Sequence, residues 1–246
     1  MTNLEPNIGA GTKVAKRVLT IFFLLDHSAS MQEDGRISKL NDAIPVTIDA
    51  LKSLLDDNPN LSIKIKVIKF STKADFHVGG SAGTDIENFQ WYPLELDART
   101  ATAGAINLLC DQLDFEKMPK RGYPPVCVLV SDGYCTDSES EYSRAIDRLN
   151  KDPWGKKAAR IVVSIGDEID EDSLKRFVNE RGSYINCENA RQIVDYIKLK
   201  TTEASISSSE SKPIGDNQND INVPNNNNNG NTSDGTLAGA DPNEAW

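Results

Sequence analysis

The chain has 246 residues and a formal net charge of −10 at pH 7, and this length suggests one domain with an appendage. Five acidic residues lie in residues 213–246, which contain no Lys or Arg, so the rest of the chain carries a net charge of −5. An acidic body without a basic cluster argues against nucleic-acid binding, because that binding depends on neutralising phosphates. It favours protein partners or a cation.

The cysteines and the apolar runs indicate the cellular compartment of the protein. The four cysteines show no C-x-x-C spacing, so we expect free thiols in a reducing, cytoplasmic compartment rather than a zinc ribbon. No apolar run approaches the ~20 residues that a transmembrane helix needs. The stretch KVAKRVLTIFFLL followed by SAS resembles a signal peptide, but its apolar run is short and Asp26 and His27 interrupt it. A secreted protein is therefore the weaker alternative, and an intact mature N-terminus would exclude it.

The first half of the chain opens with a polar lead-in, residues 1–16. The apolar run 18–25 predicts a strand buried on both faces, as in a parallel sheet. Apolar residues then recur at helical spacing over residues 37–55, and Pro45 should kink that helix. The alternating stretch 61–70 predicts a strand with one exposed face, which would carry Lys64 and Lys66. A short strand at 74–80 and a loop at 81–96 follow.

The second half alternates helices with strands. Helices are predicted at 101–113, 138–150, 170–180 and 190–203, and strands at 125–132, 159–166 and 184–186. Buried strands that alternate with helices predict an α/β fold, in which an open, mostly parallel sheet has one antiparallel edge and helices on both faces. We expect this domain to cover residues 17–205. The Asn/Ser-rich acidic tail, 206–246, has too little apolar surface to fold and is predicted to be disordered.

Three polar clusters fall where ligands bind in open α/β sheets, outside the carboxyl ends of the strands. They are Asp26, Ser28 and Ser30 after the first buried strand, Asp132 at the end of the second, and Thr100 and Thr102 at the start of a helix. Such oxygen ligands suit Mg²⁺, with Mn²⁺ or Ca²⁺ as alternatives. Two carboxylates and three hydroxyls leave room for water around the ion, so an open coordination position should accept a carboxylate from a protein partner.

The pattern D-x-S-x-S after a buried strand, with a later Thr at a helix start and an Asp at a strand end, resembles the metal-ion-dependent adhesion site of von Willebrand factor A domains. The resemblance covers residues 17–203 and implies a Rossmann-like sheet. The implied metal ligands are Asp26, Ser28, Ser30, Thr100 and Asp132. Aligning ARTATAGAI with the family's Gly-Gly-Thr phrase selects Thr100, and Thr102 stays open as the alternative.

Longer phrases are similar to the TerY-type proteins of bacterial tellurium-resistance and stress operons. They are LLDHSASM, ATAGAINLLCDQLD, VLVSDGYCTDS and KTTEASISSSES. This resemblance implies a role in stress or defence, with a protein kinase and a phosphatase encoded nearby as candidate partners. The chain departs from the family at Ala29, where Gly is usual, and at Ala98–Arg99, where Gly-Gly is usual. Arg99 could compete electrostatically with the metal.

Sites of this type usually bind rather than catalyse, so we predict a Mg²⁺-dependent interaction domain and not an enzyme. His27 and His77 are the only histidines, neither stands in a catalytic motif, and we expect His77 to be exposed. Asp137 should either support the metal ligands or cap the helix at 138–150, and Cys135 is a candidate reactive thiol. A metal-dependent phosphohydrolase that uses the same oxygens is the alternative function. A secreted adhesin is a third.

Overall fold

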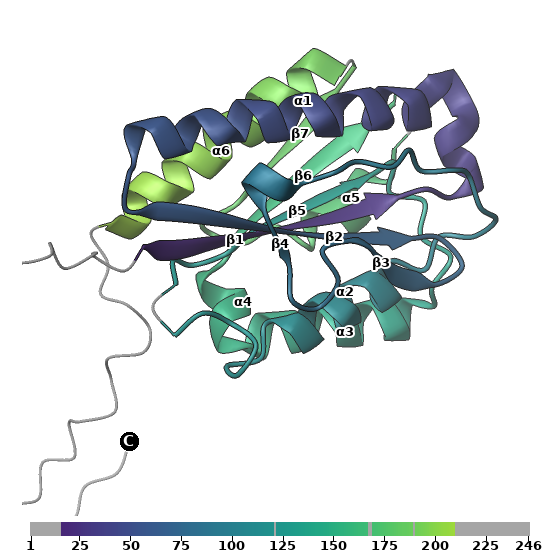
Figure 1. Cartoon of the computed structure of the whole chain (residues 1–246). Helices are drawn as coiled ribbons and strands as arrows, with labels where there is room; N and C mark the ends of the chain where they lie inside the picture. The colour runs from purple at the N-terminus through teal and green to yellow at the C-terminus, as the bar shows by residue number, and fades with distance from the viewer. Residues whose placement is uncertain (1–15, 121, 167–168, 189, 210–246) are drawn as a thin grey trace, which may run out of the picture. The chain divides into compact units, whose positions relative to one another are not determined.

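Strands and helices alternate along the chain in the computed structural model (Figure 1). The structure describes residues 16–120, 122–166, 169–188 and 190–209. The predicted lead-in and tail lie outside the described residues, apart from Lys16 and residues 206–209, which end the last helix. No helix within the described ranges is long and apolar enough to cross a membrane.

In this described part the strands form one sheet, joined by α-helices and two 3-10 turns. The strands are β1 (Arg17–Asp26), β2 (Leu61–Phe70), β3 (Ala74–Val78), β4 (Thr84–Asp85), β5 (Val126–Ser131), β6 (Ala159–Ile165) and β7 (Ser183–Cys187). The helices are α1 (Arg36–Asp57), α2 (Thr102–Gln112), α3 (Glu139–Lys151), α4 (Pro153–Lys157), α5 (Glu171–Lys175) and α6 (Ala190–Ser209). The 3-10 turns are η1 (Ala29–Gly35) and η2 (Ile86–Asn88).

The sheet has the strand order β3-β2-β1-β5-β6-β7, with β4 paired to β2 outside this path. The strands from β2 to β7 in this order run parallel, and β3 pairs with β2 antiparallel at the edge. This arrangement confirms the predicted α/β class. On one side, β1 pairs with β2, the next strand in the chain. On its other side, β1 pairs with β5, which comes later in the chain, so the strand order reverses direction at β1. The crevice where ligands bind in such sheets therefore lies between the carboxyl ends of β1 and β5.

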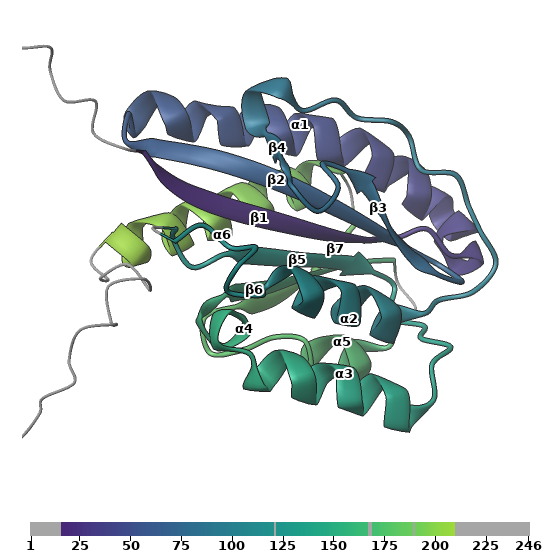
Figure 2. The same ribbon diagram turned by 60° about the horizontal axis from the view of Figure 1, so that its bottom comes forward.

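Alternation along β1 divides its side chains between two hydrophobic cores. Phe23 and Leu25 pack in the core beneath α1 and α6, whereas Phe22 and Leu24 pack in the core that α2, α3, α4 and α5 cover. Figure 1 shows α1 and α6 together on one side of the sheet, and Figure 2 shows the other four helices on the opposite side. Because both faces are covered, β1 contains an unbroken apolar run, as predicted.

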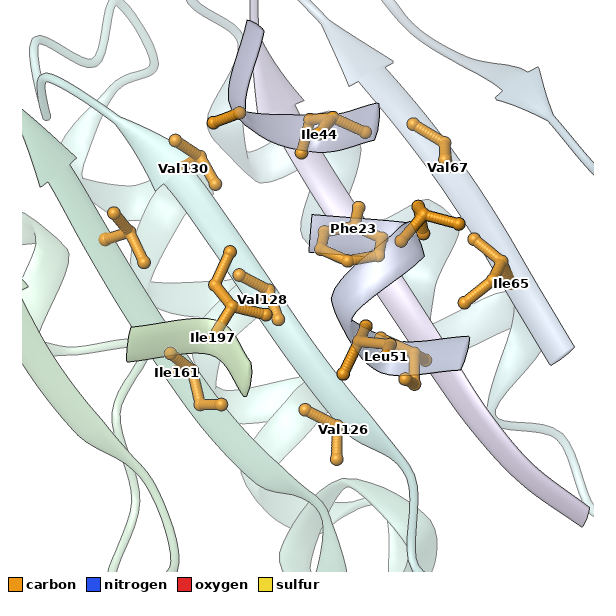
Figure 3. Close-up of a cluster of buried hydrophobic side chains, with 14 of the residues drawn as sticks. Phe23, Ile44, Leu51, Ile65, Val67, Val126, Val128, Val130, Ile161 and Ile197 are labelled. Atoms are coloured by element: carbon orange, nitrogen blue, oxygen red, sulfur yellow. The ribbon is translucent and has the colours of Figure 1, made fainter. Parts of the chain in front are cut away.

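The core beneath α1 and α6 anchors the two central strands to each other. Phe23 of β1 stands opposite Val128 of β5 in the sheet register, and Ile44 of α1 and Ile197 of α6 lie over this region (Figure 3). All four side chains are completely buried. The rigid packing of β1 against β5 fixes the relative positions of the residues at the two strand ends.

Several expectations about local structure were wrong. The helix predicted at 170–180 covers only Glu171–Lys175 as α5, and the loop predicted at 81–96 contains β4 and η2. Lys66 is 3% exposed, because α2 packs over the face of β2 that we expected to meet solvent, and its Nζ donates a hydrogen bond to Gln112 Oε1 of α2 at 3.3 Å. The last helix runs to Ser209 rather than to 203. The helix α1 continues through Pro45. The short helix α4, which starts with Pro153 after the capping side chain of Asp152, was not predicted.

Candidate metal site

The first predicted ligand, Asp26, ends β1 and is completely buried. Its Oδ1 accepts a hydrogen bond from the backbone N–H of Ser28 at 2.9 Å. Its Oδ2 accepts one from the Ser131 hydroxyl, at the end of β5, at 2.6 Å. These two bonds hold the carboxylate between the ends of the central strands.

Ser28 and Ser30 bring their hydroxyls together in the turn that follows β1. Their Oγ atoms lie 3.1 Å apart, and the N–H of Met31 donates to the Ser28 carbonyl at 3.0 Å to form the first bond of η1. In this tight turn the hydroxyls of Ser28 and Ser30 lie on the same side, and residue 29 between them faces solvent. This arrangement explains why the polar residues stand at alternate positions. Ala29 therefore fits where the family usually has Gly.

Asp132, the second predicted carboxylate, follows β5 directly and is completely buried. Its Oδ1 accepts a hydrogen bond from the backbone N–H of Tyr134 at 3.2 Å. Its Oδ2 accepts one from Nη1 of Arg36 at 3.1 Å. Each oxygen of Asp26 and Asp132 thus accepts at least one hydrogen bond from the described part of the chain. A carboxylate offers about four lone-pair sites, so each group keeps capacity for a further contact.

The two threonines that the sequence left open differ in their surroundings. Thr100 is 4% exposed, and among the described residues its Oγ1 has no hydrogen-bond partner. Its backbone is held on both sides, because its N–H donates to Thr136 Oγ1 at 3.2 Å and its carbonyl accepts from Thr136 N–H at 2.9 Å. The hydroxyl of Thr102 instead interacts with the Cys135 thiol. The unpaired hydroxyl of Thr100 favours it as the ligand.

Asp137 acts on the helix that follows Thr100. Its Oδ2 accepts a hydrogen bond from Ala103 N–H at 2.6 Å, in the first turn of α2, where the free N–H groups of a helix favour an anion. The expectation that Asp137 caps the helix at 138–150 was wrong, since Ser138 forms that cap together with Glu141. Asp137 therefore ties the loop after β5 to the start of α2.

Cys135 does not fit the prediction of a reactive thiol. Burial raises its pKa above the usual value, and the Asp137 carboxylate, which accepts its S–H at 3.0 Å, raises it further. The thiolate is the reactive form of cysteine, so these surroundings suppress reactivity. All four cysteines are free.

The electrostatics of the site favour a cation. Burial raises the pKa of Asp26 to about 6, against the lowering effect of its bonds to Ser131 and Ser28, and the nearby Asp132 carboxylate adds to the rise. Within the described ranges, no three His, Cys, Asp or Glu side chains gather so that they could hold a metal. An ion here must therefore use hydroxyl oxygens. The paired serine hydroxyls and the free Thr100 hydroxyl fit a hard divalent ion that retains some water.

Arg36, which the sequence pattern does not predict as a site residue, is a buried cation that contacts the site. It is 1% exposed and forms an ion pair with Asp132. Arg99, the residue we expected to compete with the metal, is exposed to solvent. The signal for Arg36 in the sequence is weak, because an Arg at the start of a helix usually faces water.

The two histidines lie beside the site rather than in it. His27 is 7% exposed, and its Nδ1 lies 2.7 Å from the Glu95 carbonyl oxygen. His77, expected to be exposed, is half-buried, with Nε2 2.6 Å from the Tyr92 carbonyl oxygen and its ring against Trp91. Both line a hollow of about 360 Å³ next to the site, together with Lys69 and residues 93–97. Each ring is therefore oriented by a backbone carbonyl.

A family model described as von Willebrand factor type A domain matches residues 20–199, and the chain therefore belongs to this family. Domains of the family are generally metal-dependent modules for protein interaction, typically without enzymatic activity, and they bind a divalent metal at a metal-ion-dependent adhesion site. No curated protein sequence matches the chain.

Solved structures share the fold at low sequence identity. A von Willebrand factor type A protein from Catenulispora acidiphila is 14% identical, with a TM-score of 0.59 over 77% of this chain and 43% of that one. The BatB protein of Bacteroides thetaiotaomicron is 17% identical, with a TM-score of 0.54 over 76% of this chain and 99% of that one. Proximal thread matrix protein 1 from the mussel byssus, solved with a zinc-occupied adhesion-site motif, is 13% identical, with a TM-score of 0.51 over 79% and 46%. These identities show the fold alone, and the chain spans less than half of the first and third proteins.

Proposed function

We propose that this chain is a protein-interaction domain that works through one bound divalent cation, Mg²⁺ in the cell. The proposed ligands are Asp26, Ser28, Ser30, Thr100 and Asp132. The observation that carries the proposal is that two buried carboxylates lie at the carboxyl ends of β1 and β5, with the paired hydroxyls of Ser28 and Ser30 beside Asp26. The loop after β5 also holds the backbone of Thr100, the third proposed hydroxyl ligand. An all-oxygen set of this kind suits Mg²⁺ first, and Mn²⁺ or Ca²⁺ as substitutes.

The ligands divide into two groups by chemistry. The hydroxyls of Ser28, Ser30 and Thr100 would contact the ion directly. Asp26 and Asp132 already accept hydrogen bonds from the chain, so they would contact the ion directly or through water. Mg²⁺ gives up water reluctantly, and a coordination position left to water can be taken by a carboxylate from outside.

The partner would therefore present an acidic side chain, with apolar groups around it. Two large apolar side chains at the site are exposed, Leu96 at 39% and Tyr134 at 44%. Tyr134 is two residues from Asp132, and Leu96 adjoins Asp97, whose N–H donates to the His27 carbonyl at 2.8 Å. Exposed aromatic and aliphatic side chains around a polar centre are typical of interaction surfaces.

The cellular role we propose is more specific than the general function of the family. The phrases shared with TerY-type proteins support a cytoplasmic role in a tellurium-resistance, stress or defence system. A protein kinase and a phosphatase from the same operon are then the candidate partners. The phosphohydrolase alternative lacks support, because two carboxylates with an Arg on one of them resemble a single-ion site and not a two-metal hydrolytic centre.

Affinity capture with the full chain tests this function. We expect a protein that is retained in Mg²⁺, released by EDTA, and absent when Asp26→Asn replaces the wild type as bait. The Asn variant is matched in size, and we expect circular dichroism to show that it keeps the fold. Retention that is equal with Mg²⁺, with EDTA and with the variant would contradict the proposal. Phosphatase activity that requires Mg²⁺ and is lost in the variant would favour the alternative.

A further inference from the structure

Arg36 is a buried cation in direct contact with a proposed metal ligand. Its side chain is 1% exposed. Nη1 donates to Asp132 Oδ2 at 3.1 Å and to the Ser30 carbonyl at 3.4 Å, and Nη2 lies 3.4 Å from a carboxylate oxygen of Glu33, which is 64% exposed. Two of these contacts are with residues of the proposed site.

The fold builds a place for this guanidinium from distant segments. Asp34 and Gly35 both have positive φ angles, 51° and 65°, and this turn directs Arg36 inward at the start of α1. Gly166, which follows β6, packs against the guanidinium, because a Cβ added there would lie 2.6 Å from Cζ of Arg36. A non-glycine residue with positive φ is uncommon and costs energy, so the inward position of Arg36 is a specific feature of the chain.

We propose that Arg36 is a positioned counter-cation that shares Asp132 with the metal, so that it weakens binding of the ion but strengthens binding of the partner's carboxylate. The inference rests on the proposed function and specifies how the site is tuned. Asp26 and Asp132 together carry two negative charges, which a divalent ion alone would neutralise. Arg36 adds one positive charge, and the Glu33 carboxylate beside it offsets this charge only weakly, because Glu33 is 64% exposed and solvent screens it. The loaded site is therefore left with a net positive charge that attracts an acidic group.

A purely structural role for Arg36 predicts a different result. If the arginine only held the strand ends in place, its removal would loosen the site and weaken metal binding and carboxylate binding together. As a counter-cation, its removal changes the two affinities in opposite directions. The sign of the change in metal affinity therefore separates the two roles.

The first experiment measures Mn²⁺ affinity of the full chain by electron paramagnetic resonance at about pH 8, where carboxylates in solution are ionised. We expect Arg36→Met to bind Mn²⁺ roughly tenfold more tightly than the wild type. Arg36→Lys, which keeps the charge, should stay within about threefold of the wild type. Equal or weaker Mn²⁺ binding by Arg36→Met would overturn the inference.

The second experiment measures the affinity of the metal-loaded site for a carboxylate, with acetate as the probe. At saturating Mn²⁺, broadening of the acetate methyl resonance reports occupancy beside the ion. We expect acetate to bind Arg36→Met more weakly than wild type, and equal or tighter binding would contradict the charge argument. If the wild type binds no Mn²⁺ at all, the proposed function fails; if it binds Mn²⁺ and the variant shows no gain, only the role of Arg36 fails.

The double variant Asp132→Asn/Arg36→Met covers the case in which Arg36→Met does not fold, because it replaces both charges of the pair and leaves neither of them buried alone. The double variant should bind Mn²⁺ more tightly than Asp132→Asn alone, because the remaining ligands are relieved of the positive charge. Equal or weaker binding by the double variant would also overturn the inference.

Discussion

Arg36 and Lys66 are both buried cations, 1% and 3% exposed, but their surroundings differ. Arg36 lies at the carboxyl end of the sheet and forms an ion pair with Asp132. Lys66 lies between β2 and α2, where its one hydrogen bond in the described structure goes to the neutral amide of Gln112, and its Nζ is 5.4 Å from the centre of the Phe22 ring. A buried charge is costly unless it is paired. The comparison indicates that Arg36 belongs to the site, whereas Lys66 is a local cost to stability.

Breaking the Arg36–Asp132 pair should have the largest effect on stability. In EDTA, Arg36→Met leaves the Asp132 carboxylate buried without its counter-charge, and we expect the free energy of unfolding to fall by roughly 3–5 kcal/mol. Urea denaturation measures this loss. Mg²⁺ should restore more stability to the variant than to the wild type, because the ion replaces the missing charge. A variant that Mg²⁺ does not stabilise would show that the pair is independent of the metal.

Asp26 is a buried anion that can be compared with the two buried cations. Among the described residues it forms no ion pair. Its pKa is raised to about 6 by burial, so the metal-free protein gains stability when Asp26 is protonated. This gain is complete below the unfolded pKa of about 4 and is lost as pH rises to about 6, a difference of roughly 2–3 kcal/mol. Denaturation in EDTA from acidic to neutral pH measures it. Asp26→Asn should remove this part of the pH dependence, and an unchanged profile would contradict the assignment.

Lys66→Met should stabilise the protein, the reverse of the effect at Arg36. Burial, together with nearby Lys117 and Lys64, lowers the pKa of Lys66 to about 8, so below that pH the folded state holds an unpaired cation. We expect a gain of roughly 1–3 kcal/mol at neutral pH. The gain should shrink between about pH 8 and pH 10.5, where the folded protein releases the proton and the unfolded chain still holds it. Thermal unfolding of both proteins measures the difference, and a loss of stability would mean that the cation is well solvated.

Whether Thr100 or Thr102 is the metal ligand should affect metal affinity more than stability. Thr100→Val should weaken Mg²⁺ or Mn²⁺ binding at least roughly tenfold and change stability by less than about 0.5 kcal/mol. Thr102→Val is the matched control, because its hydroxyl interacts with the Cys135 thiol, and it should leave metal affinity unchanged. The opposite pattern in calorimetric titrations would assign the ligand to Thr102.

The sequence was sufficient to predict the sheet and the polar cluster around β1. The apolar run of β1 and the alternate polar residues after it are local patterns, and the parallel sheet brings their neighbours from β5 to the same edge. The pairing of Ser28 with Ser30 follows from the tight turn between them. The family assignment to residues 20–199 agrees with this part of the prediction.

The buried cations could not be predicted, because distant segments determine them. Arg36 depends on space at Gly166, 130 residues away in the chain, and on a left-handed turn at Asp34, a conformation that non-glycine residues adopt only rarely. Lys66 occupies the polar position of an alternating strand, and only the packing of α2 closes that face. His77 is likewise covered by the loop that contains Tyr92. In each case a tertiary contact overrides a correct local pattern.

A titration of the full chain with Mn²⁺, followed by electron paramagnetic resonance, tests the central claim most directly. We expect the wild type to bind one ion per chain and Asp26→Asn to lose this binding. Val128→Ala, a core variant that should cost roughly 1–3 kcal/mol of stability, serves as the control and should bind the ion like the wild type. The metal site is wrong if the wild type binds no ion, or if Asp26→Asn binds it as tightly as the wild type does.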